Sequence, residues 1–116
     1  MKIVGIIPCR YESSRFPGKS LAIINGKPMM WHVYQRALKS SVLDEIYIAT
    51  DDMRIVKVAD EYGLKTIMTS TKHKTGTDRV AEAANQIQAD YYVNIQGDEP
   101  MIDPEAIKLV AQAIID

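Results

Sequence analysis

Short apolar runs rich in β-branched residues alternate along the chain with longer stretches whose apolar residues are spaced three and four apart. The runs are the expected strands, and they cover residues 3–7, 45–49, 66–69 and 91–95. The stretches are the expected helices, and they cover residues 28–38, 53–62, 77–87 and 104–115. The order β-α-β-α-β-α-β-α predicts an α/β fold, in which helices flank a mostly parallel sheet and right-handed crossovers join the strands.

Several expected helices carry local start or stop signals. Pro28 suits the first turn of the first helix, because its missing N–H has no partner there in any case. Asp52 is expected to cap the second helix, and Gly63 to end it. For the third helix we expect Thr75 or Thr77 at the N-cap, with Asp78 placed favourably in the first turn.

Length and composition limit the class of protein. The 116 residues predict one domain, spanning 1–116, and the mix of 47% hydrophobic and 25% charged residues is typical of a soluble globular protein. The formal net charge of -1 gives no sign of the basic excess that nucleic-acid binding favours. The first apolar run is far too short to span a membrane. Cys9, the single cysteine, suits a reducing compartment. We therefore expect a cytoplasmic protein with neither nucleic acid nor membrane as a partner.

The polar segments that follow the strands are the expected location of the chemistry, because ligands of open α/β sheets bind at the carboxyl ends of strands. The first such segment, residues 8–20, contains Arg10, Arg15, Lys19 and three serines. Cations and hydroxyls grouped in this way suit a polyphosphate. The alternative is a solvated basic loop, and the clustering of three cations makes it the weaker interpretation.

Two common nucleotide motifs are excluded. Gly18-Lys19-Ser20 resembles the end of a P-loop, but Ser13 stands where that motif requires glycine, and Asn25-Gly26 turns the chain soon afterwards. The dinucleotide fingerprint G-x-G-x-x-G is absent.

Paired carboxylates follow the last expected strand. Asp98 and Glu99 follow it after Gln96 and Gly97, and an acid opposite a cationic loop is what Mg²⁺ bound to a triphosphate needs. A simple turn before Pro100 is the alternative. Asp52 is interpreted as the cap of the second helix, and neither Asp51 nor Asp52 is counted as a metal ligand. His73 has no second ligand beside it and predicts no metal site.

Residues 7–19 read I-P-C-R-Y-E-S-S-R-F-P-G-K, which resembles the opening motif I-P-A-R-Y-x-S-[ST]-R-[LF]-P-G-K of the cytidylyltransferases for 3-deoxy-manno-octulosonate (KDO). Only Cys9 departs from the pattern, and we interpret it as a packing residue rather than a reactive one. Residues 68–79 resemble the family's M-T-x-x-x-H-x-[ST]-G-T-[DE]-R, and residues 94–100 its N-[VI]-Q-G-D-E-P. The resemblance implies a three-layer α/β/α, Rossmann-like nucleotidyltransferase fold similar to glycosyltransferase A. That fold would be incomplete here, because members of the family are considerably longer.

The resemblance also implies a reaction, in which CMP passes from CTP to KDO and gives CMP-KDO and pyrophosphate for lipopolysaccharide synthesis. The residues it implies for CTP binding are Arg10, Ser13, Arg15, Lys19, Gly76, Thr77, Arg79 and Gln96. It assigns catalytic roles to Arg10, Lys19 and Asp98, with Asp98 as the Mg²⁺ ligand. It further implies a homodimer for the full-length enzyme, and a CTP and Mg²⁺ site alone for a chain of this length.

Three alternatives stay open from the sequence. The acceptor could be 8-amino-KDO, because in the family the sugar pocket lies mainly beyond Asp116. It could be a nonulosonic acid, although those enzymes open with a loop richer in glycine than residues 11–15. The chain could also be an inactive nucleotide-binding fragment, although its charged motif residues are all present.

Overall fold

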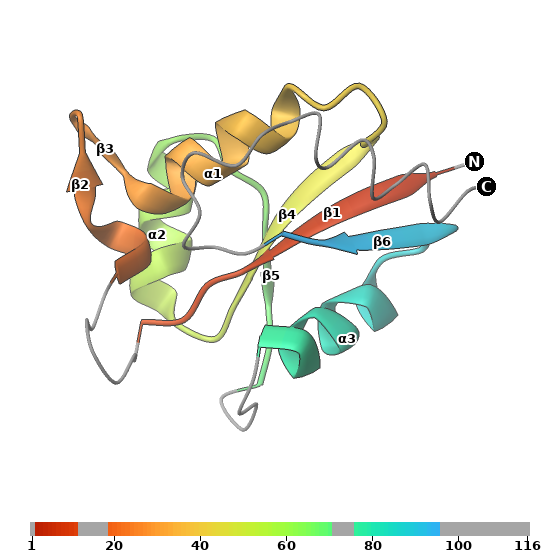
Figure 1. The fold of residues 1–116 in the computed structure, drawn as a ribbon. Helices are drawn as coiled ribbons and strands as arrows, with labels where there is room; N and C mark the ends of the chain where they lie inside the picture. Colours follow the sequence, from red (N-terminus) through yellow and green to blue (C-terminus); the bar gives the residue numbers. More distant parts are fainter. Residues whose placement is uncertain (1, 12–18, 71–75, 96–116) are drawn as a thin grey trace.

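A computed structural model describes residues 2–11, 19–70 and 76–95 (Figure 1). The elements in chain order are β1 (Ile3–Pro8), the single 3-10 turn η1 (Lys19–Leu21), β2 (Ile23–Ile24), β3 (Lys27–Pro28), α1 (Met29–Leu38), β4 (Glu45–Thr50), α2 (Met53–Glu61), β5 (Thr66–Met68), α3 (Gly76–Gln86) and β6 (Tyr91–Asn94). The four expected strands and the first three expected helices are confirmed. The fourth expected helix, residues 104–115, lies outside the described residues.

The main sheet has the strand order β5-β4-β1-β6, and each of its pairings is parallel. The register places Ile6 of β1 beside Tyr47 of β4 and Asn94 of β6. Because the strands are parallel, their carboxyl ends lie along one edge of the sheet, where the sequence predicted the chemistry.

Alternate residues of β1 build two separate cores. Ile3 and Ile7 join a cluster with the apolar faces of α1 and α2, whereas Val4 and Ile6 pack with Ala83 of α3. Figure 1 shows α1 and α2 on one side of the sheet and α3 on the other. The predicted α/β/α layering is therefore confirmed, and a strand that is apolar on both faces is its central element.

Cys9 directly follows β1, and its side chain belongs to the core cluster under α1 and α2. Its side chain is 2% exposed, and its backbone N–H donates to the Ala49 carbonyl at 2.9 Å. The structure therefore confirms the interpretation of Cys9 as a packing residue.

Two predicted helix signals of α2 are confirmed. The Asp52 carboxylate accepts a hydrogen bond from the Arg54 N–H at 2.8 Å, which caps the helix. At the other end Gly63 has φ +71°, and the Leu64 N–H donates to the Ala59 carbonyl at 2.9 Å. This is the glycine-terminated helix end that the sequence predicted.

One other boundary prediction is wrong, and one is tested only in part. Pro28 lies at the N-cap of α1 with extended backbone (ψ 151°), because it pairs with Ile23 in the β2–β3 hairpin. Thr77 lies inside α3, which begins at Gly76, so Thr77 is no cap; Asp78 is in the first turn as expected. Thr75, the residue before the first residue of α3, lies outside the described residues, so a cap at Thr75 stays a prediction. None of the helices in the described ranges is long and apolar enough to cross a membrane.

Candidate functional site

The carboxyl edge of the sheet brings together segments that are far apart in the sequence. Arg10 and Tyr11 follow β1, Asp51 and Asp52 follow β4, and Thr69 and Ser70 follow β5. Backbone hydrogen bonds continue the pairing of the strands at this edge. The Thr69 N–H donates to the Thr50 carbonyl at 2.8 Å, and the Ile95 N–H donates to the Ile6 carbonyl at 2.9 Å. The prediction that these polar segments share one edge is therefore confirmed for their described parts.

The structure describes five of the nine predicted site residues in whole or in part. Arg10 is exposed and follows the buried Cys9, two residues after β1 ends. Lys19 opens η1, Gly76 and Thr77 open α3, and Arg79 is buried in the first turns of that helix. Ser13, Arg15, Gln96 and Asp98 lie outside the described residues. Their roles, and those of the five, stay predictions.

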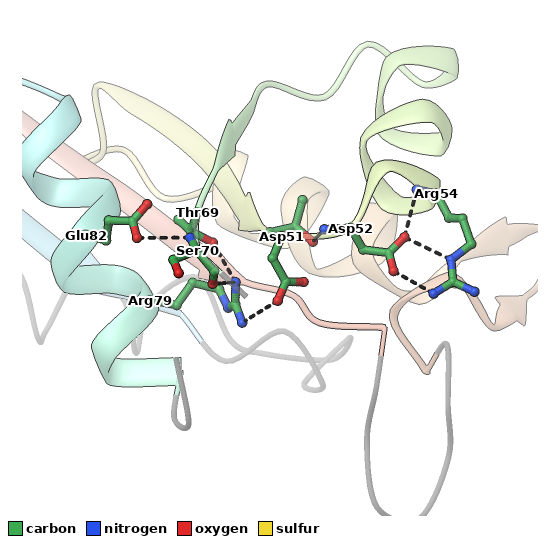
Figure 2. Close-up of polar contacts among 8 residues, drawn as sticks. Asp51, Asp52, Arg54, Thr69, Ser70, Arg79 and Glu82 are labelled. Carbon is green, nitrogen blue, oxygen red and sulfur yellow. Dashed lines mark hydrogen bonds and ion pairs between the residues drawn. The ribbon is translucent and has the colours of Figure 1, made fainter. Parts of the chain in front are cut away.

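Arg79 is a buried cation held by three polar partners (Figure 2). Its side chain is 3% exposed. Nη1 donates to the Thr69 hydroxyl at 2.5 Å and to the Ser70 carbonyl at 3.4 Å. Nη2 donates to the Asp51 carboxylate at 3.2 Å. A buried charge requires such pairing, since an isolated one would lose its hydration without compensation. Arg79 therefore ties the ends of β4 and β5 to α3.

Two further side chains of α3 hold the end of β5. The Glu82 carboxylate accepts the Ser70 N–H at 3.0 Å, and the Gln86 amide donates to the Met68 carbonyl at 3.2 Å. Arg79, Glu82 and Gln86 are spaced three and four apart, which places them on one face of the helix. This face fixes the backbone of β5 where the loop after it begins.

Asp52 makes a second, more exposed ion pair. Arg54 Nε donates to Oδ1 at 2.9 Å and Nη2 to Oδ2 at 2.6 Å, in the bidentate arrangement typical of arginine and carboxylate. The hydrogen bonds from Arg54 lower the pKa of Asp52 below its ordinary value. The same guanidinium lies over the ring of Tyr11, with Cζ 3.3 Å from the ring centroid. The start of the loop after β1 thereby contacts the start of α2.

The two neighbouring aspartates therefore contact different parts of the site: Asp51 bonds to Arg79 beside the loop after β5, and Asp52 bonds to Arg54 beside the loop after β1. Figure 2 shows Asp51 pointing toward Arg79 and Asp52 pointing toward Arg54. Because β4 lies between β5 and β1, its end is next to both loops. Sequence reasoning found the cap at Asp52 but missed the pair between Asp51 and Arg79. One signal was available: Arg79 stands four residues before the buried Ala83, on the face of α3 that meets the sheet.

No group of three or more His, Cys, Asp or Glu that could hold a metal ion is present in the part of the chain that the structure describes. Asp51 and Asp52 each form an ion pair with an arginine.

Comparisons with known proteins extend these observations. The sequence profile of a family described as "Cytidylyltransferase" matches residues 4–116. A protein of Geotalea daltonii named "3-deoxy-manno-octulosonate cytidylyltransferase" is 56% identical over 107 residues, which are 92% of this chain and 42% of that protein. An Escherichia coli protein of the same name is 48% identical over 115 residues, covering 99% and 47%.

Among solved structures, one described as "CMP:2-keto-3-deoxy-manno-octonic acid synthetase complexed with CTP" superposes on all of this chain and on 48% of that protein. The TM-score is 0.97 and the sequence identity 47%. The chain spans less than half the length of these relatives. These comparisons confirm the family that the motifs indicated. They also confirm the predicted fold, which is incomplete relative to these proteins.

Proposed function

Since this chain belongs to the cytidylyltransferase family, we propose that it provides the CTP-binding half of an enzyme that transfers CMP from CTP to KDO. The observation that carries the proposal is the likeness over the whole chain to a structure described as a CTP complex, at 47% identity. The product CMP-KDO would serve lipopolysaccharide synthesis. We expect the full-length protein to be a cytoplasmic homodimer.

The proposed nucleotide site is built around the cationic loop after β1. Arg10 is exposed and follows the buried Cys9, so it is accessible at the ligand-binding edge of the sheet. Ser13, Arg15 and Lys19 continue the same loop and add donors and charge for the phosphates. Gly76, Thr77, Arg79 and Gln96 are proposed to recognise the cytosine base.

In the proposed reaction a hydroxyl of the sugar attacks the α-phosphorus of CTP. A new O–P bond forms, the hydroxyl loses its proton to water, and the bond from that phosphorus to the departing pyrophosphate breaks. The protein contributes mainly orientation and charge stabilisation. Arg10, Arg15 and Lys19 neutralise the charge that grows on the pyrophosphate.

Asp98 is the proposed ligand of Mg²⁺, because carboxylate oxygens suit this ion and the aspartate follows β6, the strand next to β1. The bound ion would supply charge neutralisation and polarise phosphate oxygens.

Asp98→Asn is therefore expected to remove most of the Mg²⁺ dependence of CTP affinity, measured by calorimetry with and without Mg²⁺. An unchanged dependence would contradict the assignment.

The decisive test of the proposal is nucleotide titration by calorimetry, with CTP compared against ATP and GTP. We expect a preference for CTP, and we expect Arg10→Ala to weaken CTP binding. Lys2→Ala is the matched control, because Lys2 precedes β1 at the opposite edge of the sheet. Equal affinity for all three nucleotides would contradict the proposed base recognition.

Pyrophosphate release in the presence of CTP, Mg²⁺ and KDO should be followed beside the titration. CTP binding without release would agree with a chain that supplies only the nucleotide half. If release occurs, 8-amino-KDO and a nonulosonic acid used in place of KDO decide which acceptor is preferred.

A further inference from the structure

The ring of Tyr11 links the loop after β1 to the rest of the molecule. It packs against the core cluster under α1 and α2, and the Arg54 guanidinium lies over it at 3.3 Å. Cation–π contacts of this kind favour one relative position of ring and cation. Tyr11 immediately follows Arg10, so whatever holds its ring also sets where the backbone of Arg10 leaves the sheet.

Arg54 is itself held in place. Both oxygens of Asp52 accept hydrogen bonds from its guanidinium, at 2.9 and 2.6 Å, which fixes the plane that stacks on Tyr11. The Asp52 N–H in turn donates to the hydroxyl of Thr50 at 3.3 Å, and Thr50 is fully buried at the end of β4. A continuous chain of contacts therefore runs from the sheet through Asp52 and Arg54 to Tyr11.

We propose that Tyr11, Arg54 and Asp52 form a brace that positions Arg10 for the triphosphate of the bound nucleotide. The inference rests on the proposed function, since it assumes that Arg10 binds CTP phosphates. Asp52 neutralises the charge of Arg54, so the brace acts through geometry and adds no net cation to the site. The three side chains are positioning residues. Their loss should weaken the binding of a nucleotide more, the more phosphates that nucleotide carries.

The substitution Asp52→Asn separates positioning from simple electrostatics. Asparagine caps helices about as well as aspartate, so α2 is retained, but the bidentate ion pair is lost. Removing a negative charge near a triphosphate would by Coulomb's law strengthen CTP binding. The brace predicts the opposite: CTP affinity falls roughly threefold to tenfold, the range expected from losing one exposed ion pair and one cation–π contact. CMP affinity, with a single phosphate, should change less than about twofold.

Further variants and a stability measurement show whether a change in CTP affinity comes from the brace. Glu45→Gln makes the same chemical change at the opposite edge of the sheet, where Glu45 pairs with Lys2, and should leave CTP affinity unchanged. Tyr11→Phe keeps the ring and should retain affinity, whereas Tyr11→Leu should lose it. Thermal unfolding of each variant shows whether the fold is intact, and Asp52→Asn supplies the test if Tyr11→Leu does not fold.

The outcomes distinguish the brace from the function on which it rests. If the parent chain binds CTP and Asp52→Asn binds it equally well or more tightly, the brace is wrong and the proposed function stands. Equal losses for CTP and CMP would also overturn the brace, because a general structural defect has that signature. If the parent chain does not bind CTP, the proposed function itself is overturned, and the brace with it.

Discussion

Two adjacent aspartates at the end of β4 each form an ion pair with an arginine, and the two pairs differ in burial. Asp51 and Arg79 are 3.2 Å apart, with side chains that are 19% and 3% exposed. Asp52 and Arg54 are closer, at 2.6 Å, but their side chains are 17% and 55% exposed. The shorter distance belongs to the pair that we expect to matter less for stability. The surroundings of a charge, more than its distance from a partner, determine how much stability is lost when the charge is removed.

The physical reason lies in solvation. Water compensates for a broken ion pair at the surface, and such pairs contribute about 0–1 kcal/mol. A guanidinium that is buried on all sides has no such compensation, and breaking its pair costs about 3–5 kcal/mol. Arg79 also bonds to Thr69 and Ser70, so its removal leaves several polar groups without partners at once.

The largest expected effect therefore comes from Arg79. Replacing it with methionine should lower the free energy of unfolding by about 3 kcal/mol, because Asp51 and the Thr69 hydroxyl lose their partner. Urea unfolding followed by circular dichroism measures this loss. Arg54→Met is the matched control and should cost less than about 1 kcal/mol. Similar losses for the two variants would contradict the expected effect of burial.

Asp51→Asn should have an intermediate effect of about 1–2 kcal/mol, since the amide oxygen still accepts a hydrogen bond and the position is partly exposed. A double-mutant cycle with Arg79→Met sharpens the prediction. If the two side chains act as one pair, the double variant loses less stability than the two single losses added together. Simple additivity would show that Arg79 depends on Thr69 and Ser70 alone.

At Asp52 we expect the cap, and not the ion pair, to contribute most to stability. Asp52→Ala removes the hydrogen bond to the Arg54 N–H and should cost about 1 kcal/mol. Asp52→Asn keeps a capping oxygen, so its cost should be smaller. Helix content and the midpoint of thermal unfolding report both effects. Equal losses in the two variants would instead favour the ion pair.

The smallest expected effect is a pH dependence. The pKa of Asp52 is lowered on folding, chiefly by hydrogen bonds from the Arg54 side chain, from an ordinary value of 3.8. The folded state therefore binds this proton less readily than the unfolded state. The stabilisation is complete above the unfolded pKa and is lost as the pH falls through the folded pKa. Between pH 6 and pH 3, the parent chain should lose slightly more unfolding free energy than Asp52→Asn, by less than about 1 kcal/mol. Identical acid profiles would contradict this contribution.

Much of the fold could be predicted from the sequence, because its signals are local. Apolar runs report which strands are buried, and a cap such as Asp52 acts on an N–H only two residues away. The motif around Arg10 likewise predicted the family, since a long continuous string carries its own specificity. These features depend on neighbours along the chain, so they can be interpreted without knowing how the chain folds.

Contacts between residues far apart in the sequence depend on the tertiary structure. Asp51 and Arg79 are separated by 28 residues, and their contact exists because the sheet order places the end of β4 beside β5 and under α3. The stacking of Arg54 on Tyr11 follows in the same way from the pairing of β4 with β1. The prediction for Pro28 was wrong for a related reason, because Pro28 pairs with Ile23 in a hairpin and therefore does not enter the helix. The pattern along the chain determines which surfaces become buried, whereas the order in which the strands pair determines which polar groups share those surfaces.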